Sequence, residues 1–173
     1  MPTRPLTPAD AATFKAALWP QLFARLHDDL AAMLRAASEA HEAATHEEAK
    51  PENDKDTRGL VESYLAAGQA ARATELQREL SVLKAVALAA PSVIQTVAVG
   101  ALVTVRDDDS DVVTDALIVP VGAGMALVHQ GRRVQVISSQ APLARAVLGK
   151  AVGDSVDVVI AGKPRTFVID ALA

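Results

Sequence analysis

Apolar side chains recur at helical spacing through the first ninety residues. From Leu22 onward they return every three or four positions, and charged residues occupy the positions between them. A first stripe comprises Leu22, Leu26, Leu30, Met33, Ala37, Ala40 and Ala44. A second stripe comprises Leu65, Leu76, Leu80, Leu83 and Ala87. The spacing therefore predicts two long amphipathic helices.

The most polar segment of the chain, around residues 47–59, separates these helices. About ten polar residues with Pro51 among them are typical of a turn between antiparallel helices. We therefore predict a helical hairpin over residues 20–90 with its tip at about 47–59. The alternative is a pair of ordinary core helices folded against the second half of the chain.

Two prolines divide the N-terminal region. Thr7-Pro8 is a plausible helix start, and Pro20 predicts the start of a second helix, because proline inside a helix costs roughly 3 kcal/mol. Residues 1–19 would then form a separate, helical N-terminal extension. Phe14, Leu18 and Trp19 would pack it on the base of the hairpin.

The pattern changes at Pro91, after which β-branched residues alternate with polar ones. Five or six short strands are expected, with turns at the acidic segment 107–111, at 121–126 and at 162–164. One short helix is expected from Pro142 to Leu148, because Gly149 follows as a helix end. The fold class predicted is α+β, a helical hairpin followed by a small antiparallel sheet domain over residues 91–173.

The net charge, the lack of cysteine and the N-terminal residues exclude several classes of protein. A net charge of -4 argues against a protein that binds duplex DNA by neutralising phosphates. There is no cysteine, so disulfides and thiolate metal sites are excluded. The first twenty residues lack the apolar run of a signal peptide or a membrane span. We expect a soluble, cytoplasmic protein with no membrane partner.

Catalytic motifs fail on spacing. His41 and His46 lie five residues apart, whereas a zincin helix needs a step of four. The acidic segment from Asp107 has Val112 and Ile118 where a calcium loop needs glycine and glutamate. No nucleophile pattern is present, so we expect no enzyme and no tightly bound cofactor. The acids of the tip, Glu47, Glu48, Glu52, Asp54 and Asp56, are candidate ligands for a divalent cation completed by a partner; an ordinary solvated turn is the alternative.

The segment VQVISSQAPLARAVLGKAVGDSVDVVI, residues 134–160, resembles the Gre family of bacterial transcript-cleavage factors. In that family a strand ending in Ile-Ser precedes Ser-Pro-Ile-Ala-Arg/Lys-Ala-Leu-Ile-Gly-Lys and then Gly-Asp-x-Val. The matching positions are Pro142, Ala144, Arg145, Ala146, Leu148, Gly149, Lys150, Gly153 and Asp154, whereas Ala141 replaces a serine. Tyr64-Leu65-Ala66-Ala67 is similar to the Tyr-x-Ala-Ala that follows the family's tip. The resemblance covers residues 20–173.

The resemblance implies an N-terminal coiled coil, an FKBP-like C-terminal domain and RNA polymerase as the partner. The hairpin would enter the secondary channel, while the β domain docks at its rim through candidates such as Pro142, Arg145 and Lys150. Contact with nascent RNA would be indirect. The family's tip Asp and Glu fall on Thr57 and Leu60, which cannot ligate Mg²⁺, so Asp54 and Asp56 are the nearest substitutes.

This departure favours regulation of elongation over stimulated RNA cleavage, which stays open. Two alternatives remain. One is a coiled-coil interaction module outside transcription. The other is a prolyl isomerase, which we disfavour because residues 91–173 contain a single aromatic side chain, Phe167, and offer little to line an aromatic pocket.

Overall fold

The computed structural model describes residues 8–45, 58–89 and 94–173. Two long helices, α1 (Pro8–Thr45) and α2 (Arg58–Ala89), precede the strands. The chain divides into two compact units, one formed by Met1–Leu22 with Ser81–Ala173 and the other by Phe23–Leu80. The bases of both helices thus belong with the β domain. This division differs from the segments 1–19, 20–90 and 91–173, which remain a prediction.

The helix break predicted at Pro20 is absent, because α1 runs through Pro20 without interruption. Buried side chains continue on one stripe across the proline, with Leu18 before it and Leu22 after it both fully buried. Pro20 itself is exposed. The carbonyl that loses its hydrogen-bond partner therefore lies on a solvated side of the helix, and burial of the apolar stripe outweighs the helix-breaking cost of proline.

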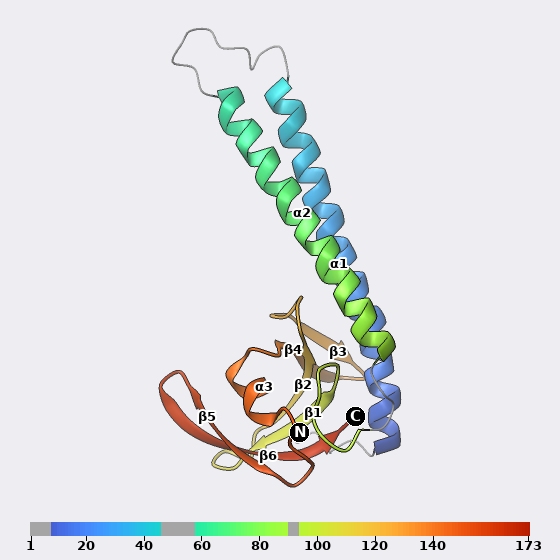
Figure 1. The fold of residues 1–173 in the computed structure, drawn as a ribbon, viewed down its shortest axis with the longest axis vertical. Coiled ribbons are helices and arrows are strands. Elements are labelled where there is room, and N and C mark those ends of the chain that lie inside the picture. The colour runs from blue at the N-terminus through green and yellow to red at the C-terminus, as the bar shows by residue number, and fades with distance from the viewer. Residues whose placement is uncertain (1–7, 46–57, 90–93) are drawn as a thin grey trace. The chain divides into compact units, whose positions relative to one another are not determined.

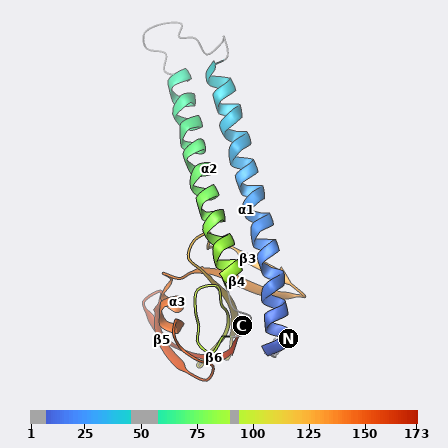
Figure 2. The ribbon, with the colours of Figure 1, turned by 45° about the vertical axis from the view of Figure 1, so that its right-hand side comes forward.

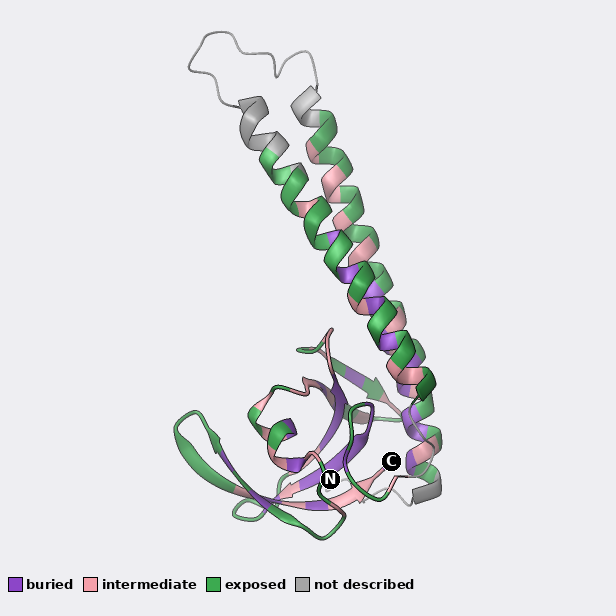
Figure 3. Ribbon diagram, viewed as in Figure 1, coloured by how far each residue is buried: buried purple, intermediate pink, exposed green. Residues whose placement is uncertain are grey.

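The second unit, Phe23–Leu80, is a pair of antiparallel helical segments that lie side by side (Figures 1 and 2). Leu26, Ala73, Leu76 and Leu80 are buried between them. Buried positions lie toward one end of the pair, and the positions nearer Thr45 and Arg58 are half-buried or exposed (Figure 3). Leu65, predicted in the apolar stripe, is 55% exposed, since α1 offers mainly alanines along this part.

The β domain holds one six-stranded sheet in the order β3-β4-β2-β1-β6-β5. Its strands are β1 (Leu102–Asp107), β2 (Val113–Val119), β3 (Ala126–His129), β4 (Arg132–Ser138), β5 (Ser155–Ile160) and β6 (Lys163–Leu172). The helix α3 (Pro142–Val147) lies between β4 and β5 in the chain, as predicted. The predicted α+β class is confirmed.

One strand pairing differs from prediction. β2 pairs with β4 in parallel, so the sheet is mixed and not wholly antiparallel. The hairpin predicted at 121–126 is therefore wrong, because β3 pairs with β4 and not with β2. Gly122 and Gly124 do adopt positive φ, but Gly124 N–H donates to the Val136 carbonyl at 2.9 Å, which ties this connection to β4.

The predicted acidic turn is present, and the turn predicted at 162–164 lies slightly earlier, because Lys163 and Pro164 already pair with β5. The acidic segment joins the antiparallel strands β1 and β2. Ala161 (φ 51°) and Gly162 (φ 77°) form the turn between β5 and β6, a pair of positive φ angles suited to a tight hairpin. Because successive side chains of a strand point to opposite sides, the sheet has two distinct faces.

Each face of the sheet is covered by a different element. Val103, Val105 and Ile118 face α3 and form a core with its Ala144 and Val147. On the opposite face Phe14 of α1 lies beside the β3–β4 turn, with its ring centroid 5.0 Å from that of His129. The base of α1 is therefore an integral layer of the β domain.

Candidate docking groove

The connection from β4 into α3 is fixed by short-range hydrogen bonds. Ser138 Oγ accepts from Gln140 N–H at 3.1 Å, and the Ser138 carbonyl accepts from Ala141 N–H at 2.9 Å. Pro142 then occupies the first turn of α3, where a missing N–H costs nothing and the fixed φ suits a helix. These contacts fix the start of α3 at Pro142, and the start of the helix determines which of its side chains point outward.

The C-terminal end of α3 is fixed by backbone geometry. Gly149 adopts φ 77°, and its N–H donates to the Val97 carbonyl at 2.8 Å. Gly153 adopts φ 92°, and the Asp154 carboxylate accepts from Ala151 N–H at 2.8 Å. Glycine and a short acid at these positions of the Gre-like motif therefore serve the fold.

Other matches to that motif differ in how far their side chains are exposed. Ala144 is fully buried on the inner side of α3, whereas Pro142, Arg145 and Lys150 are exposed. Exposed residues of a motif that do not support the backbone are candidates for binding. These three are the docking residues predicted from the sequence.

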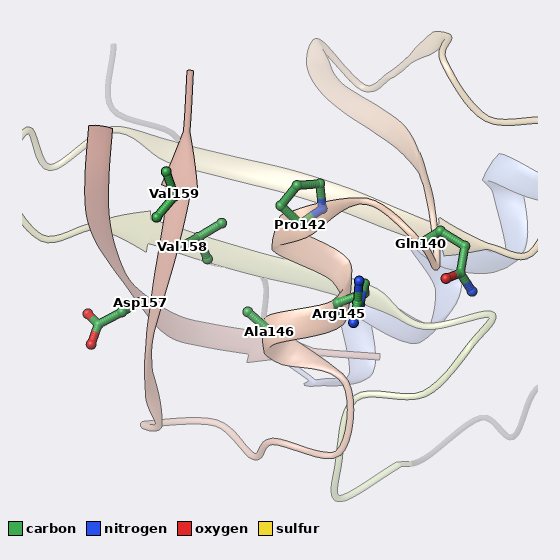
Figure 4. A pocket seen from close by; sticks show the side chains of 7 residues that line it. All are labelled: Gln140, Pro142, Arg145, Ala146, Asp157, Val158 and Val159. Atoms are coloured by element: carbon green, nitrogen blue, oxygen red, sulfur yellow. The ribbon is translucent and has the colours of Figure 1, made fainter. Parts of the chain in front are cut away.

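Two of the three line one groove between α3 and β5. The groove has a volume of about 440 Å³ and is lined by Gln140, Pro142, Arg145, Ala146, Asp157, Val158 and Val159 (Figure 4). Lys150 is not among the lining residues. The structure therefore brings Pro142 and Arg145 together and leaves Lys150 beyond the far end of α3.

The groove combines apolar walls with one cation. In the part of the chain that the structure describes, no ion pair joins the Arg145 guanidinium to a carboxylate. The acid in the lining, Asp157, accepts a hydrogen bond from Thr166 Oγ1 at 2.8 Å across the β5–β6 pair. Such a surface can bind a carboxylate and apolar side chains, and it holds no nucleophile paired with a base.

Two basic residues of the sheet, Arg132 and Arg165, form ion pairs that support the fold. Arg132 forms a bidentate ion pair with the buried Asp115, and 10% of the Arg132 side chain is exposed. Arg165 Nε lies 2.9 Å from Asp107 Oδ2, an ion pair without hydrogen-bond geometry. The Arg165 side chain is 43% exposed, so only its partner Asp107 is buried.

Asp107 organises the acidic turn. Its Oδ1 accepts from the Ser110 hydroxyl at 2.8 Å and from Ser110 N–H at 2.9 Å. The hydroxyl bond, helped by the backbone bond and by Arg165, lowers the pKa of Asp107 against the opposing effect of desolvation. The segment is a hydrogen-bonded turn between β1 and β2, as predicted.

A second cavity, of about 360 Å³, lies between the first turns of α1 and the β3–β4 turn. Its lining includes Asp10, Thr13, Phe14 and His129. Gln21 Nε2 lies 3.1 Å from His129 Nδ1, so the same imidazole contacts two turns of α1. Nearby, burial lowers the pKa of Lys15.

The candidate metal ligands Asp54 and Asp56 lie outside the described residues. Within the described residues, no three His, Asp or Glu side chains gather to hold a metal ion. A search of the same residues for a helix long and apolar enough to cross a membrane found none.

Comparison with known proteins adds one sequence match. The family described as transcription elongation factor, GreA/GreB, C-term, matches residues 91–172. No curated protein sequence matches the chain.

Several solved structures align with the chain at low similarity. GreA factor homolog 1 (Gfh1) of Thermus thermophilus is 19% identical, with 87% of this chain and 94% of that chain covered and a TM-score of 0.37. Gfh1 of Thermus aquaticus is 18% identical, with 87% and 92% covered and a TM-score of 0.38. The GreA/GreB elongation factor of Nitrosomonas europaea is 19% identical, with 62% and 92% covered and a TM-score of 0.36. These likenesses carry no inference about function.

The match over residues 91–172 coincides with the sheet domain and includes α3 with its two fixed ends. The chain therefore carries, at residues 91–172, the C-terminal domain of the GreA/GreB family of transcription elongation factors, as the resemblance in its sequence predicted.

Proposed function

We propose that this protein is a Gre-like regulator of transcription elongation that binds RNA polymerase. The observation that carries the proposal is the family match over residues 91–172. The exposed Pro142 and Arg145 support it, because they share one groove in which the Arg145 guanidinium forms no ion pair among the described residues. In this proposal the groove contacts the polymerase at the rim of its secondary channel.

The helical pair has the second role in the proposal. It would enter the secondary channel with the segment between α1 and α2 directed at the active centre, where contact with nascent RNA is indirect. Asp54 and Asp56 are the candidates for sharing a Mg²⁺ with the polymerase, since carboxylate oxygens suit that ion. Phosphodiester chemistry would stay with the polymerase, so the chain itself would not be an enzyme.

A stalled, backtracked elongation complex tests the proposal. Added protein should bind the complex and change either pausing or restart. A complex that neither binds the protein nor changes transcript length or restart would contradict the proposal. If cleavage appears, Asp54→Ala and Asp56→Ala should abolish it and leave binding intact, whereas the neighbouring Asn53→Ala should keep both.

A coiled-coil interaction module outside transcription is the second candidate. Tyr64 and Leu65 keep it open, because these two neighbouring apolar residues of α2 are 71% and 55% exposed and suit a partner of either kind. Competition with a known secondary-channel factor for purified polymerase separates the two functions. Displacement supports the elongation regulator, and undisturbed binding of both proteins supports the alternative.

A further inference from the structure

The groove beside α3 runs along the edge of a strand. Asp157, Val158 and Val159 are consecutive in β5, and all three line it. Neighbouring side chains of a strand point to opposite faces, so three successive residues meet one cavity only where it follows the backbone. Figure 4 agrees, since Val158 points toward α3 and Asp157 points away from it.

That edge of β5 has no strand beside it. β5 is the last strand in the sheet order, and its pairing partner within the described residues is β6, through an uninterrupted antiparallel register from Ser155 to Ile160. The N–H and C=O groups on the other side of β5 therefore have no sheet partner among the described residues. Such an edge is a template for another strand.

The devices that usually protect an edge are missing from β5. The strand contains no proline and no lysine, and its one charge is Asp157. Val159 and Ile160 are 64% and 37% exposed. Exposed apolar residues on an unbulged edge favour pairing with an extended chain.

The opposite wall of the groove supplies the charge preference. Arg145 projects from α3, whereas the carboxylate of Asp157 is held by Thr166 on the side away from α3 (Figure 4). A strand paired to β5 would present one alternate set of side chains to the α3 side, where Arg145, Ala146 and Val158 lie, and the other set to the side of Asp157. Carboxylates suit a guanidinium best.

We propose that this groove binds an extended, acidic segment of a partner protein, which adds to β5 as a seventh strand and places a carboxylate on Arg145. The inference rests on the proposal that the groove is a docking surface, and it specifies how the groove recognises its partner. A bound helix would leave the β5 edge unpaired. A second copy of this chain that paired its own β5 with this edge would bring a single acid, Asp157, which already accepts a hydrogen bond from Thr166.

Labelled octapeptides test this inference on the full chain without polymerase. A peptide of alternating valine and glutamate should bind, by fluorescence anisotropy, at least about tenfold tighter than its valine–lysine counterpart. Arg145→Glu should remove or reverse that preference. Lys163→Glu makes the same charge change at an exposed position outside the groove and should preserve it. N-methylation of alternate peptide bonds should abolish binding.

Hydrogen exchange of the β5 amides provides the second readout, and bound peptide should slow exchange along this strand. The inference is overturned by absent binding, by equal affinity for an acidic helical peptide, by binding that leaves β5 amides unprotected, or by self-association that occupies the edge. If the protein binds polymerase in the elongation assay but gives any of these four results, strand addition to β5 is wrong and the proposed function still holds.

Discussion

Arg132 holds Asp115 through both carboxylate oxygens. Arg132 Nε donates to Oδ2 at 3.0 Å, and the terminal nitrogen Nη2 lies 2.9 Å from Oδ1 and 2.7 Å from Oδ2. Thr104 Oγ1 adds a third donor to Asp115 Oδ1 at 2.7 Å. The Arg132 guanidinium carbon lies 5.9 Å from the centre of the Phe14 ring, so α1 helps to shield the pair from water.

Breaking this pair from one side should be costly. Asp115→Ala leaves the mostly buried Arg132 charge without its carboxylate, and we expect a loss of about 3–5 kcal/mol in the free energy of unfolding. Adding Arg132→Met to that variant removes the stranded charge and should recover part of the loss. Urea unfolding of both variants measures the difference, and equal stability of single and double variants would contradict this account.

Phe14 should stabilise the β domain, even though it lies far from that domain in the sequence. The side chain is 3% exposed, so Phe14→Ala should cost about 3–5 kcal/mol. Leu88→Ala is the control, because Leu88 is 89% exposed and its truncation should change stability by less than about 0.5 kcal/mol. Similar thermal unfolding of the two variants would show that α1 does not form a layer of the domain.

Pro20 should be a destabilising residue. Because α1 continues through it and its ring is exposed, Pro20→Ala restores a backbone hydrogen bond without disturbing the core, and stability should rise by up to about 3 kcal/mol. Pro142→Ala is the matched control at the first turn of α3, where the effect should be far smaller. A gain at Pro142 and none at Pro20 would argue against a continuous helix.

Ser110 should make stability depend on pH through Asp107. The folded state lowers the pKa of this carboxyl below its unfolded value of about 3.9, so its contribution is complete above that pH and is lost as pH falls through the folded pKa. Ser110→Ala should therefore destabilise the protein at pH 7 and differ little from the parent protein near pH 2. Urea unfolding at both values measures this, with Ser155→Ala as the exposed control.

Local patterns predicted most of the elements and missed two long-range outcomes. Helical periodicity and β-branched alternation indicated both long helices, the sheet and α3, because these depend on residues near one another in the chain. The parallel pairing of β2 with β4 was missed, since Gly122 and Gly124 look the same in a hairpin and in a crossover. The break at Pro20 was also wrong, because a buried stripe outweighed a local penalty.

The candidate site was predicted in part. Pro142 and Arg145 were identified from the Gre-like motif. The groove that they share also needs β5, and no local sequence pattern predicts where β5 lies relative to α3. The ion pair between Arg132 and Asp115 could not be predicted, because it depends on β2 lying beside β4. The roles of Asp54 and Asp56 remain predictions.

Binding of the protein to a purified bacterial RNA polymerase elongation complex is the measurement that tests the central claim most directly. The account predicts saturable binding, competition with a secondary-channel factor, and weaker binding for Arg145→Glu than for Lys163→Glu. No binding, or binding that a secondary-channel factor leaves unchanged and that both variants retain equally, would contradict it.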